Sequence, residues 1–386
     1  GGTIIGDTAS VYLANGGTAI NITGGAFSDD AGNAEGYTLP EGKVLEKDAD
    51  GLYRLKDITV LNTTTNEGYT TLAEAVEAAQ AGDTLKMVKS DTIGATVSID
   101  KELTLDLNGQ TVTSTVATAL DVKGSGTLTI TDGSDGAAGK IYRDEFSGGG
   151  VWDGAVVVEA GGALTLKKGT IEASSGYALI SSGTTEVAGG LVSSGTYGVS
   201  VKGGTFNVTG GEVYGYNYAL ETFPLEGANA AVTISGGTVW GKYSAIQLGG
   251  NFPNASATLA ITGGMVYEDP AGAQIGDNEG AAIYDDGKCA TTVTISGDAV
   301  IEQRGSLHAA IELSDNTTLN VEGGTVKAVN TGATTKSGIA VSGDAKLAVS
   351  GGSIEGYYGI DASGSAPVTV TGGTITGTYD GISASG

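Results

Sequence analysis

The chain has 386 residues, of which 67 are glycine and 5 are proline, and its 44 acidic and 19 basic residues give a formal net charge of −25 at pH 7. Nucleic acids and anionic membranes are bound through clustered Lys and Arg, so this charge argues against both partners. The single cysteine, Cys289, excludes an intrachain disulfide. No apolar run approaches the roughly 18 residues of a spanning helix, so we expect no membrane insertion.

The first 69 residues differ in pattern from the rest of the chain. The segment 1–30 ends in AINITGGAFSDD, where apolar and polar residues alternate before a Gly-Gly pair. In the next segment, 31–69, a proline and alternating acidic and basic residues replace that pattern. We interpret 1–30 as the tail coil of a preceding β-helix and 31–69 as a small β connector. Because both chain ends fall inside a repeat phrase, we expect this segment to belong to a longer polypeptide.

One helix is predicted, at 71–80. The segment 71–74 reads Thr-Leu-Ala-Glu, which is a capping box, and Gly82 provides a stop signal. Four apolar residues then share one face of the helix, namely Leu72, Ala75, Val76 and Ala79. Strand-like sequence follows at once, so the helix is placed to cover the open end of a solenoid.

From 70 to 386 one phrase recurs, in which alternating strand residues precede Gly-Gly, a small residue and then Val or Ile. The clearest copies are VTISGGTV (232–239), LAITGGMV (259–266), LNVEGGTV (319–326), LAVSGGSI (347–354) and VTVTGGTI (368–375). Successive copies lie about 21 to 34 residues apart, which is typical of solenoid coils and too short for independent domains.

A second phrase follows each Gly-Gly copy, as in YALISS (177–182), SAIQLGG (244–250) and YGIDASG (358–364). Alternation places every second side chain on one side of a strand, so Val, Ile and Leu can point inward. The sequence therefore predicts an all-β fold in which 70–386 forms a right-handed parallel β-helix of roughly a dozen coils.

The order of several phrases along the chain carries a resemblance. GGAFSDD, GYTLPEGKVLEKDADGLYRL, YTTLAEAVEAAQAGDTLKMV and LTLDLNGQTVT follow one another as in the modular, pectate-lyase-like right-handed β-helix surface proteins of gut Gram-positive bacteria. The resemblance implies an extracellular, cell-surface protein that serves as an adhesin or a stalk. It implies no particular ligand, because fold does not determine function.

Alignment of the coils brings aromatic residues into register. Aligning the coils on Gly-Gly gives a first column of Tyr214, Trp240 and Tyr267. Aligning them on the second phrase gives a second column of Tyr177, Tyr197 and Tyr218. Tyr216 and Tyr243 fall in the loops beside these columns. We expect both columns on the outside of the rod. Exposed aromatic rings suit stacking on sugars, so these eight residues are the candidate ligand-binding set. Stabilisation of the solenoid surface and contact with another protein are the alternatives.

The catalytic inventory is small. His308 is the only histidine, and no G-x-S-x-G sequence is present, so no catalytic residue is assigned. A polysaccharide lyase or glycoside hydrolase of the β-helix class is the alternative, since acidic residues gather around 268–286. The same group is the only candidate for a metal, a weakly bound calcium ion, through Asp277, Glu279, Asp285 and Asp286. No other cofactor is expected.

The sequence therefore favours an extracellular adhesin or stalk module whose aromatic columns bind glycans. The partners expected are host or plant glycans, or another surface protein. Besides the enzyme, a purely structural spacer or filament segment is a second alternative to this function.

Overall fold

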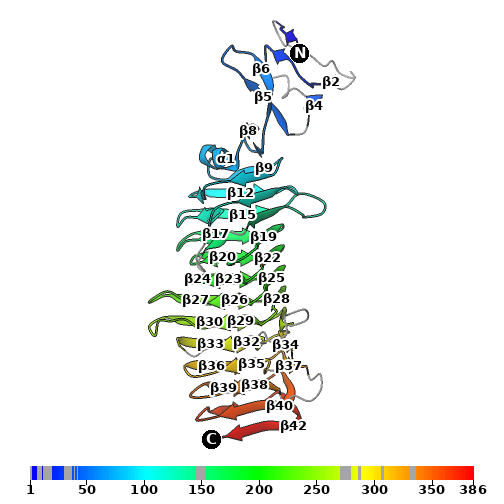
Figure 1. Cartoon of the computed structure of the whole chain (residues 1–386). Coiled ribbons are helices and arrows are strands. Elements are labelled where there is room, and N and C mark those ends of the chain that lie inside the picture. The colour runs from blue at the N-terminus through cyan, green and yellow to red at the C-terminus, as the bar shows by residue number, and fades with distance from the viewer. Residues whose placement is uncertain are drawn as a thin grey trace.

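The structure is a computed structural model that describes residues 2–6, 11, 20–29, 37–38, 40, 42–144, 153–269, 280–285, 288–305, 308–329 and 336–386. It is a long rod of stacked strands with the two chain ends at opposite ends of the rod (Figure 1). The prediction of an all-β parallel β-helix is confirmed by two long parallel sheets.

A small sheet forms the N-terminal end of the rod. Its strands, in spatial order, are β1 (Thr3–Ile4), β3 (Ala26–Phe27), β6 (Tyr53–Asp57) and β5 (Lys43–Lys47). β1 is parallel to β3, and the other pairs are antiparallel. A further pair joins β2 (Ile20–Asn21) to β4 (Tyr37–Thr38). The four-stranded sheet crosses the boundary predicted at residue 30, because β3 pairs with β1 on one side and with β6 on the other.

The cap of the solenoid consists of one helix and one hairpin. Helix α1 (Leu72–Ala78) begins at Thr71, whose hydroxyl accepts a hydrogen bond from the Glu74 amide, as the capping box predicts. The hairpin of β7 (Val60–Asn62) and β8 (Glu67–Tyr69) pairs through β7 with β9 (Asp83–Met87) in antiparallel fashion. The solenoid sheet therefore starts at Val60, ahead of the boundary predicted at residue 70.

Each coil consists of three strands, which lie on three faces of the rod. The first strands form face 1, which comprises β9, β12 (Glu102–Asp106), β15 (Thr127–Thr131), β18 (Ala163–Leu166), β21 (Thr184–Val187), β24 (Gly204–Val208), β27 (Asn229–Ile234), β30 (Ser256–Ile261), β33 (Ala290–Ile295), β36 (Thr317–Val321), β39 (Lys346–Val349) and β41 (Val368–Val370). These are twelve parallel strands within the described ranges, in agreement with the dozen coils predicted.

The second strands form face 2, which comprises β10 (Asp91–Ile93), β13 (Thr111–Ser114), β16 (Lys140–Arg143), β19 (Thr170–Ala173), β22 (Leu191–Ser194), β25 (Glu212–Gly215), β28 (Thr238–Gly241), β31 (Met265–Glu268), β34 (Val300–Gln303) and β37 (Thr325–Ala328). The third strands form face 3, which comprises β11 (Val97–Ile99), β14 (Leu120–Val122), β17 (Gly154–Val158), β20 (Tyr177–Ser181), β23 (Tyr197–Val201), β26 (Tyr218–Thr222), β29 (Ser244–Leu248), β32 (Ile283–Asp285), β35 (Ile311–Leu313) and β38 (Ser337–Val341). In the last coils, the long strands β40 (Ser353–Ser363) and β42 (Thr374–Ser385) span both of these faces.

The core is a set of aliphatic columns along the rod axis. On face 2, for example, Val213, Val239 and Val266 are directly opposite one another in consecutive coils, and each is fully buried. Burial of each such side chain contributes roughly 1.5–3 kcal/mol. One coil cannot bury its own columns, so every coil depends on its neighbours.

The corner between faces 1 and 2 explains the Gly-Gly pair. Gly237 has a positive φ of 71°, and a Cβ there would lie 2.7 Å from backbone atoms of Gly210 and Gly211 in the preceding coil. Only glycine fits both the backbone angle and this close approach.

Candidate functional site

Three aromatic side chains form a continuous stack on the outside of face 2. Tyr214, Trp240 and Tyr267 occupy equivalent positions in β25, β28 and β31 and are direct neighbours across the strands. The centres of the Tyr214 and Trp240 rings are 4.3 Å apart with the ring planes tilted by 40°, and those of Trp240 and Tyr267 are 5.6 Å apart at an angle of 8°. All three residues are half-buried. The rings therefore cover one another instead of lying flat on the sheet.

Charged side chains surround this stack. Arg304, from the following coil, lies over the Tyr267 ring with its guanidinium carbon 3.8 Å from the ring centre. Its Nε and Nη2 donate hydrogen bonds to Glu302 at 3.0 and 2.9 Å. The Trp240 indole N–H donates to Glu212 at 2.5 Å, and the Lys242 ammonium lies 5.7 Å from the Trp240 ring centre. The stack is thus both aromatic and hydrogen-bonded, although its members were predicted from their aromatic character alone.

A second aromatic stack lies at the start of three consecutive strands of face 3. Tyr177, Tyr197 and Tyr218 are opposite one another in β20, β23 and β26. Their ring centres are 5.1 and 5.7 Å apart in sequence order, with interplanar angles of 29° and 28°. Tyr197 and Tyr218 are half-buried, but Tyr177 is only 4% exposed, so the prediction of an exposed column is wrong for Tyr177. Its ring is packed inside the surface and offers no face to a ligand.

Glu221 lies beside the second stack and was not predicted as a site residue. It is 8% exposed, and its Oε1 accepts hydrogen bonds from the Tyr177 hydroxyl at 2.7 Å and the Ser200 hydroxyl at 2.9 Å. Burial raises the pKa of the Glu221 carboxyl, whereas these hydrogen bonds and the charge of Lys202 act to lower it. Burial likewise lowers the pKa of Lys202. The sequence does not reveal the environment of Glu221, because its partner Tyr177 lies two coils earlier in the rod.

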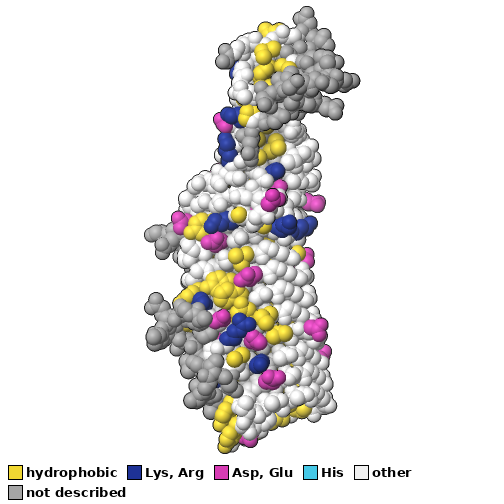
Figure 2. Space-filling view, turned by 90° about the vertical axis from the view of Figure 1, so that its right-hand side faces the viewer, with side chains coloured by type: hydrophobic (Ala, Val, Ile, Leu, Met, Phe, Trp, Pro, Cys, Tyr) yellow, Lys and Arg dark blue, Asp and Glu magenta, His cyan; other side chains and the backbone are white. Residues whose placement is uncertain are grey.

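Tyr216 and Tyr243 lie at the corner between the two stacks. Their rings meet edge to face, with centres 5.5 Å apart and an interplanar angle of 71°. The eight predicted aromatic residues therefore belong to consecutive coils on one side of the rod. The space-filling view shows hydrophobic side chains gathered about halfway along the rod, with basic and acidic side chains beside them (Figure 2). We call the seven half-buried members of this set, that is all except Tyr177, together with their charged neighbours the aromatic surface.

Of the four acidic candidates for a metal, only Asp285 lies among the described residues. Asp277, Glu279 and Asp286 lie outside the described residues. Asp285 is 1% exposed, and its carboxylate accepts a hydrogen bond from the Thr317 hydroxyl, so it is a buried structural group. Within the described ranges, no group of three or more His, Cys, Asp or Glu side chains could hold a metal ion.

His308 forms a pair with a carboxylate. Its Nδ1 lies 3.1 Å from both oxygens of Glu312, which also accepts a hydrogen bond from the Ala309 amide at 3.0 Å. Burial acts to raise the pKa of Glu312, but the His308 contact and the Ala309 hydrogen bond outweigh burial and lower it. The two side chains form a partly exposed contact beside β35, which is an ion pair when His308 is protonated.

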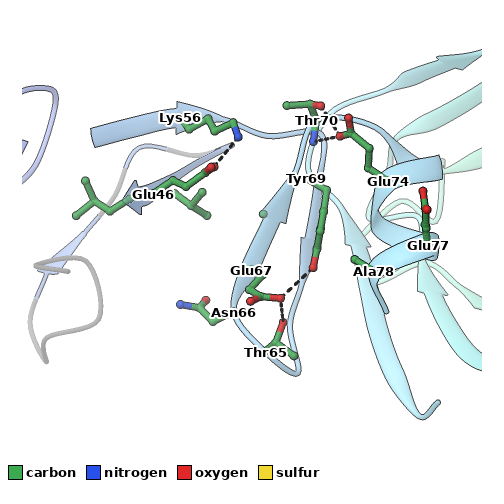
Figure 3. Close-up of a pocket in the computed structure, with 13 residues that line it drawn as sticks. Glu46, Lys56, Thr65, Asn66, Glu67, Tyr69, Thr70, Glu74, Glu77 and Ala78 are labelled. Atoms are coloured by element: carbon green, nitrogen blue, oxygen red, sulfur yellow. Dashed lines mark hydrogen bonds and ion pairs between the residues drawn. The ribbon is translucent and has the colours of Figure 1, made fainter. Parts of the chain in front are cut away.

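A cleft of about 890 Å³ separates the N-terminal sheet from the cap, between β5, β8 and α1 (Figure 3). Its polar side chains have local partners. Lys56 and Glu46 form an ion pair at 2.6 Å, and the Tyr69 hydroxyl donates to Glu67 at 2.9 Å. The Glu74 carboxylate accepts from the Thr70 amide at 3.1 Å. Each of these contacts joins residues on one side of the cleft, and none of them crosses it.

Comparison with protein-family models, curated protein sequences and solved structures finds no match for this chain. The resemblance to gut bacterial surface proteins therefore stays a prediction. Among the described residues, no helix is both long and apolar enough to cross a bilayer.

Proposed function

We propose that this chain is a rod-shaped segment of an extracellular, cell-surface adhesin or stalk, and that its aromatic surface contacts glycans. One observation carries the proposal. Seven half-buried aromatic residues and several charged side chains gather on consecutive coils on one side of the rod, beside the buried Tyr177.

Two physical arguments favour a glycan over other ligands. Ring faces and edges with nearby carboxylates match the apolar faces and hydroxyl groups of sugars. The net charge of −25 disfavours polyanions such as nucleic acids. A rigid rod also suits the presentation of such a surface at a distance, because each coil fixes the position of the next.

The test is a glycan array probed with the purified chain, followed by titration calorimetry on every positive glycan. Saturable binding that is lost in a Tyr214→Ala, Tyr267→Ala double variant supports the proposal. A matched control is Lys346→Ala, which changes face 1 far from the aromatic surface. Absence of binding to all glycans would leave a structural spacer as the better description, and release of shortened sugars would favour the enzyme.

A further inference from the structure

The aromatic stack of face 2 stops abruptly at Tyr214. In the coil before Tyr214, the equivalent outward position is Ser193, and in the coil before that it is Glu172. A small side chain therefore stands where the stack would have its next ring. The result is a gap one coil wide, with Tyr214 on one side and Glu172 on the other, which we call the Ser193 slot.

Of the three rings in this stack, only Tyr214 has one face that no neighbouring ring or cation of the described part of the chain covers. Trp240 is enclosed between Tyr214 and Tyr267, and Tyr267 lies between Trp240 and Arg304. Among the described residues, no aromatic ring and no cationic side chain stacks on the Ser193 side of Tyr214. A ligand that stacks on this column would therefore use the Ser193 side of Tyr214.

The dimensions of the slot fit a single ring. Neighbouring strands are about 4.8 Å apart, so Glu172 and Tyr214 lie roughly 9.6 Å apart along the rod. The stacked rings on the other side of Tyr214 are spaced by 4.3 and 5.6 Å. One flat ring placed over Tyr214 would thus lie at the level of Ser193 and continue the stack.

The far wall of the slot is polar. Glu172 forms an ion pair with Lys140 at 3.1 Å, and the Lys140 ammonium lies 4.6 Å from the Tyr142 ring centre. A carboxylate opposite an aromatic face can accept hydrogen bonds from hydroxyl groups on a ring that stacks through its C–H face. A sugar ring has both features.

We propose that the Ser193 slot binds one neutral hexopyranose residue of a glycan, stacked on Tyr214 and hydrogen-bonded to Glu172. This inference deepens the proposed function and rests on it. A neutral sugar is favoured over a uronate or a sulfated sugar, because Lys140 balances the charge of Glu172 and the net charge of −25 on the whole chain repels anions.

The test is to fill the slot. In a Ser193→Tyr variant, the new ring would occupy the ligand position and continue the stack, so neutral-glycan binding should fall at least tenfold while the melting temperature stays the same or rises. The control is Lys327→Tyr, which adds the same ring in the same column beyond Arg304. This control should bind as the wild type does. A second variant, Tyr214→Leu, removes the stacking face while keeping an apolar side chain and should also weaken binding.

The probes are neutral gluco-, galacto- and manno-oligosaccharides, with uronate and sulfated oligosaccharides of equal length beside them. If the Ser193→Tyr variant binds neutral glycans as tightly as the wild type does, the Ser193 slot is not the binding site, although the glycan-binding function still stands. A preference for the charged sugars would overturn the neutral class. If the wild type binds none of the probes and no glycan on an array, the slot and the proposed function both fail.

Discussion

The Tyr177 hydroxyl donates a 2.7 Å hydrogen bond to the Glu221 carboxylate across 44 positions of sequence and two coils of the rod. The contact links β20 to β26, past the intervening strand β23, whose Ser200 binds the same oxygen. A buried carboxylate that relies on partners from other coils makes the stability of this region depend on pH.

The first prediction is that Glu221→Gln stabilises the protein at pH 8 by about 1 kcal/mol, the order of the desolvation penalty of a buried polar group. Burial raises the pKa of Glu221 in the folded protein above the ordinary value of 4.5. The folded state therefore holds this proton more tightly than the unfolded chain does. The stability from Glu221 is fully present below the unfolded pKa and is lost as pH rises through the folded pKa.

Thermal unfolding at pH 4 and pH 8 checks this prediction. The gain for Glu221→Gln should be present at pH 8 and shrink at pH 4, where Glu221 is protonated. The control is Glu322→Gln, because Glu322 is exposed. An equal change in melting temperature at both pH values would contradict the argument. Tyr177→Phe, which removes a donor to Glu221, should destabilise the protein by about 1.5–3 kcal/mol at pH 8.

The second prediction concerns Trp240→Ala. This change removes two ring contacts, each worth about 0.5–1.5 kcal/mol beyond the buried area, so we expect a loss of about 1–3 kcal/mol. Tyr284→Ala is the matched control, because Tyr284 is 38% exposed on face 3. Chemical unfolding of both variants provides the measurement. A Trp240→Ala variant as stable as the control would mean that the stack contributes nothing to the solenoid.

Much of the fold follows from the Gly-Gly phrase. Aligning VTISGGTV with LAITGGMV places Val239 beside Val266 and Trp240 beside Tyr267, and the structure has both pairs in register. This works because a glycine corner that abuts the preceding coil fixes the strand after it, so counting from the corner gives the neighbour. The hairpin of β7 and β8 contains no such corner, and its antiparallel pairing was not predicted.

The candidate site was less predictable, because it depends on side-chain directions. Sequence alignment places Tyr177, Tyr197 and Tyr218 in one column but cannot show that Tyr177 is covered. It also cannot show that the rings of face 2 stack on one another, which hides both faces of Trp240. Similarly, Asp285 is the last residue of β32 and points inward, so a residue in an acidic stretch of sequence becomes a buried carboxylate.

The third prediction is that Arg304→Lys destabilises the solenoid by about 1 kcal/mol although the charge is kept. Arg304 combines a planar contact over Tyr267 with hydrogen bonds to Glu302, and a lysine ammonium cannot make both. Arg54→Lys is the control, since Arg54 pairs with Asp48 and Asp50 on an exposed surface where ion pairs contribute little. Melting curves that show the same small change for both variants would rule out a special role for the Arg304 stack.

The last prediction compares two glycines with almost the same backbone. Gly237 and Gly227 have φ values of 71° and 72°, so replacement by alanine strains both, by about 1–2 kcal/mol. They differ in their surroundings. A Cβ at Gly227 meets nothing within 4 Å, whereas one at Gly237 would lie 2.7 Å from the backbone of the preceding coil. Those atoms belong to Gly210 and Gly211, in the corner between β24 and β25, where the Gly210 amide donates to Val187 and the Gly211 carbonyl accepts from Thr238, so they cannot move aside without breaking hydrogen bonds. Gly227→Ala should therefore lose only the strain, and Gly237→Ala should lose more than about 3 kcal/mol. Urea unfolding of the two variants measures the difference, and equal losses would show that the coils are not packed as closely as the Gly-Gly corner requires.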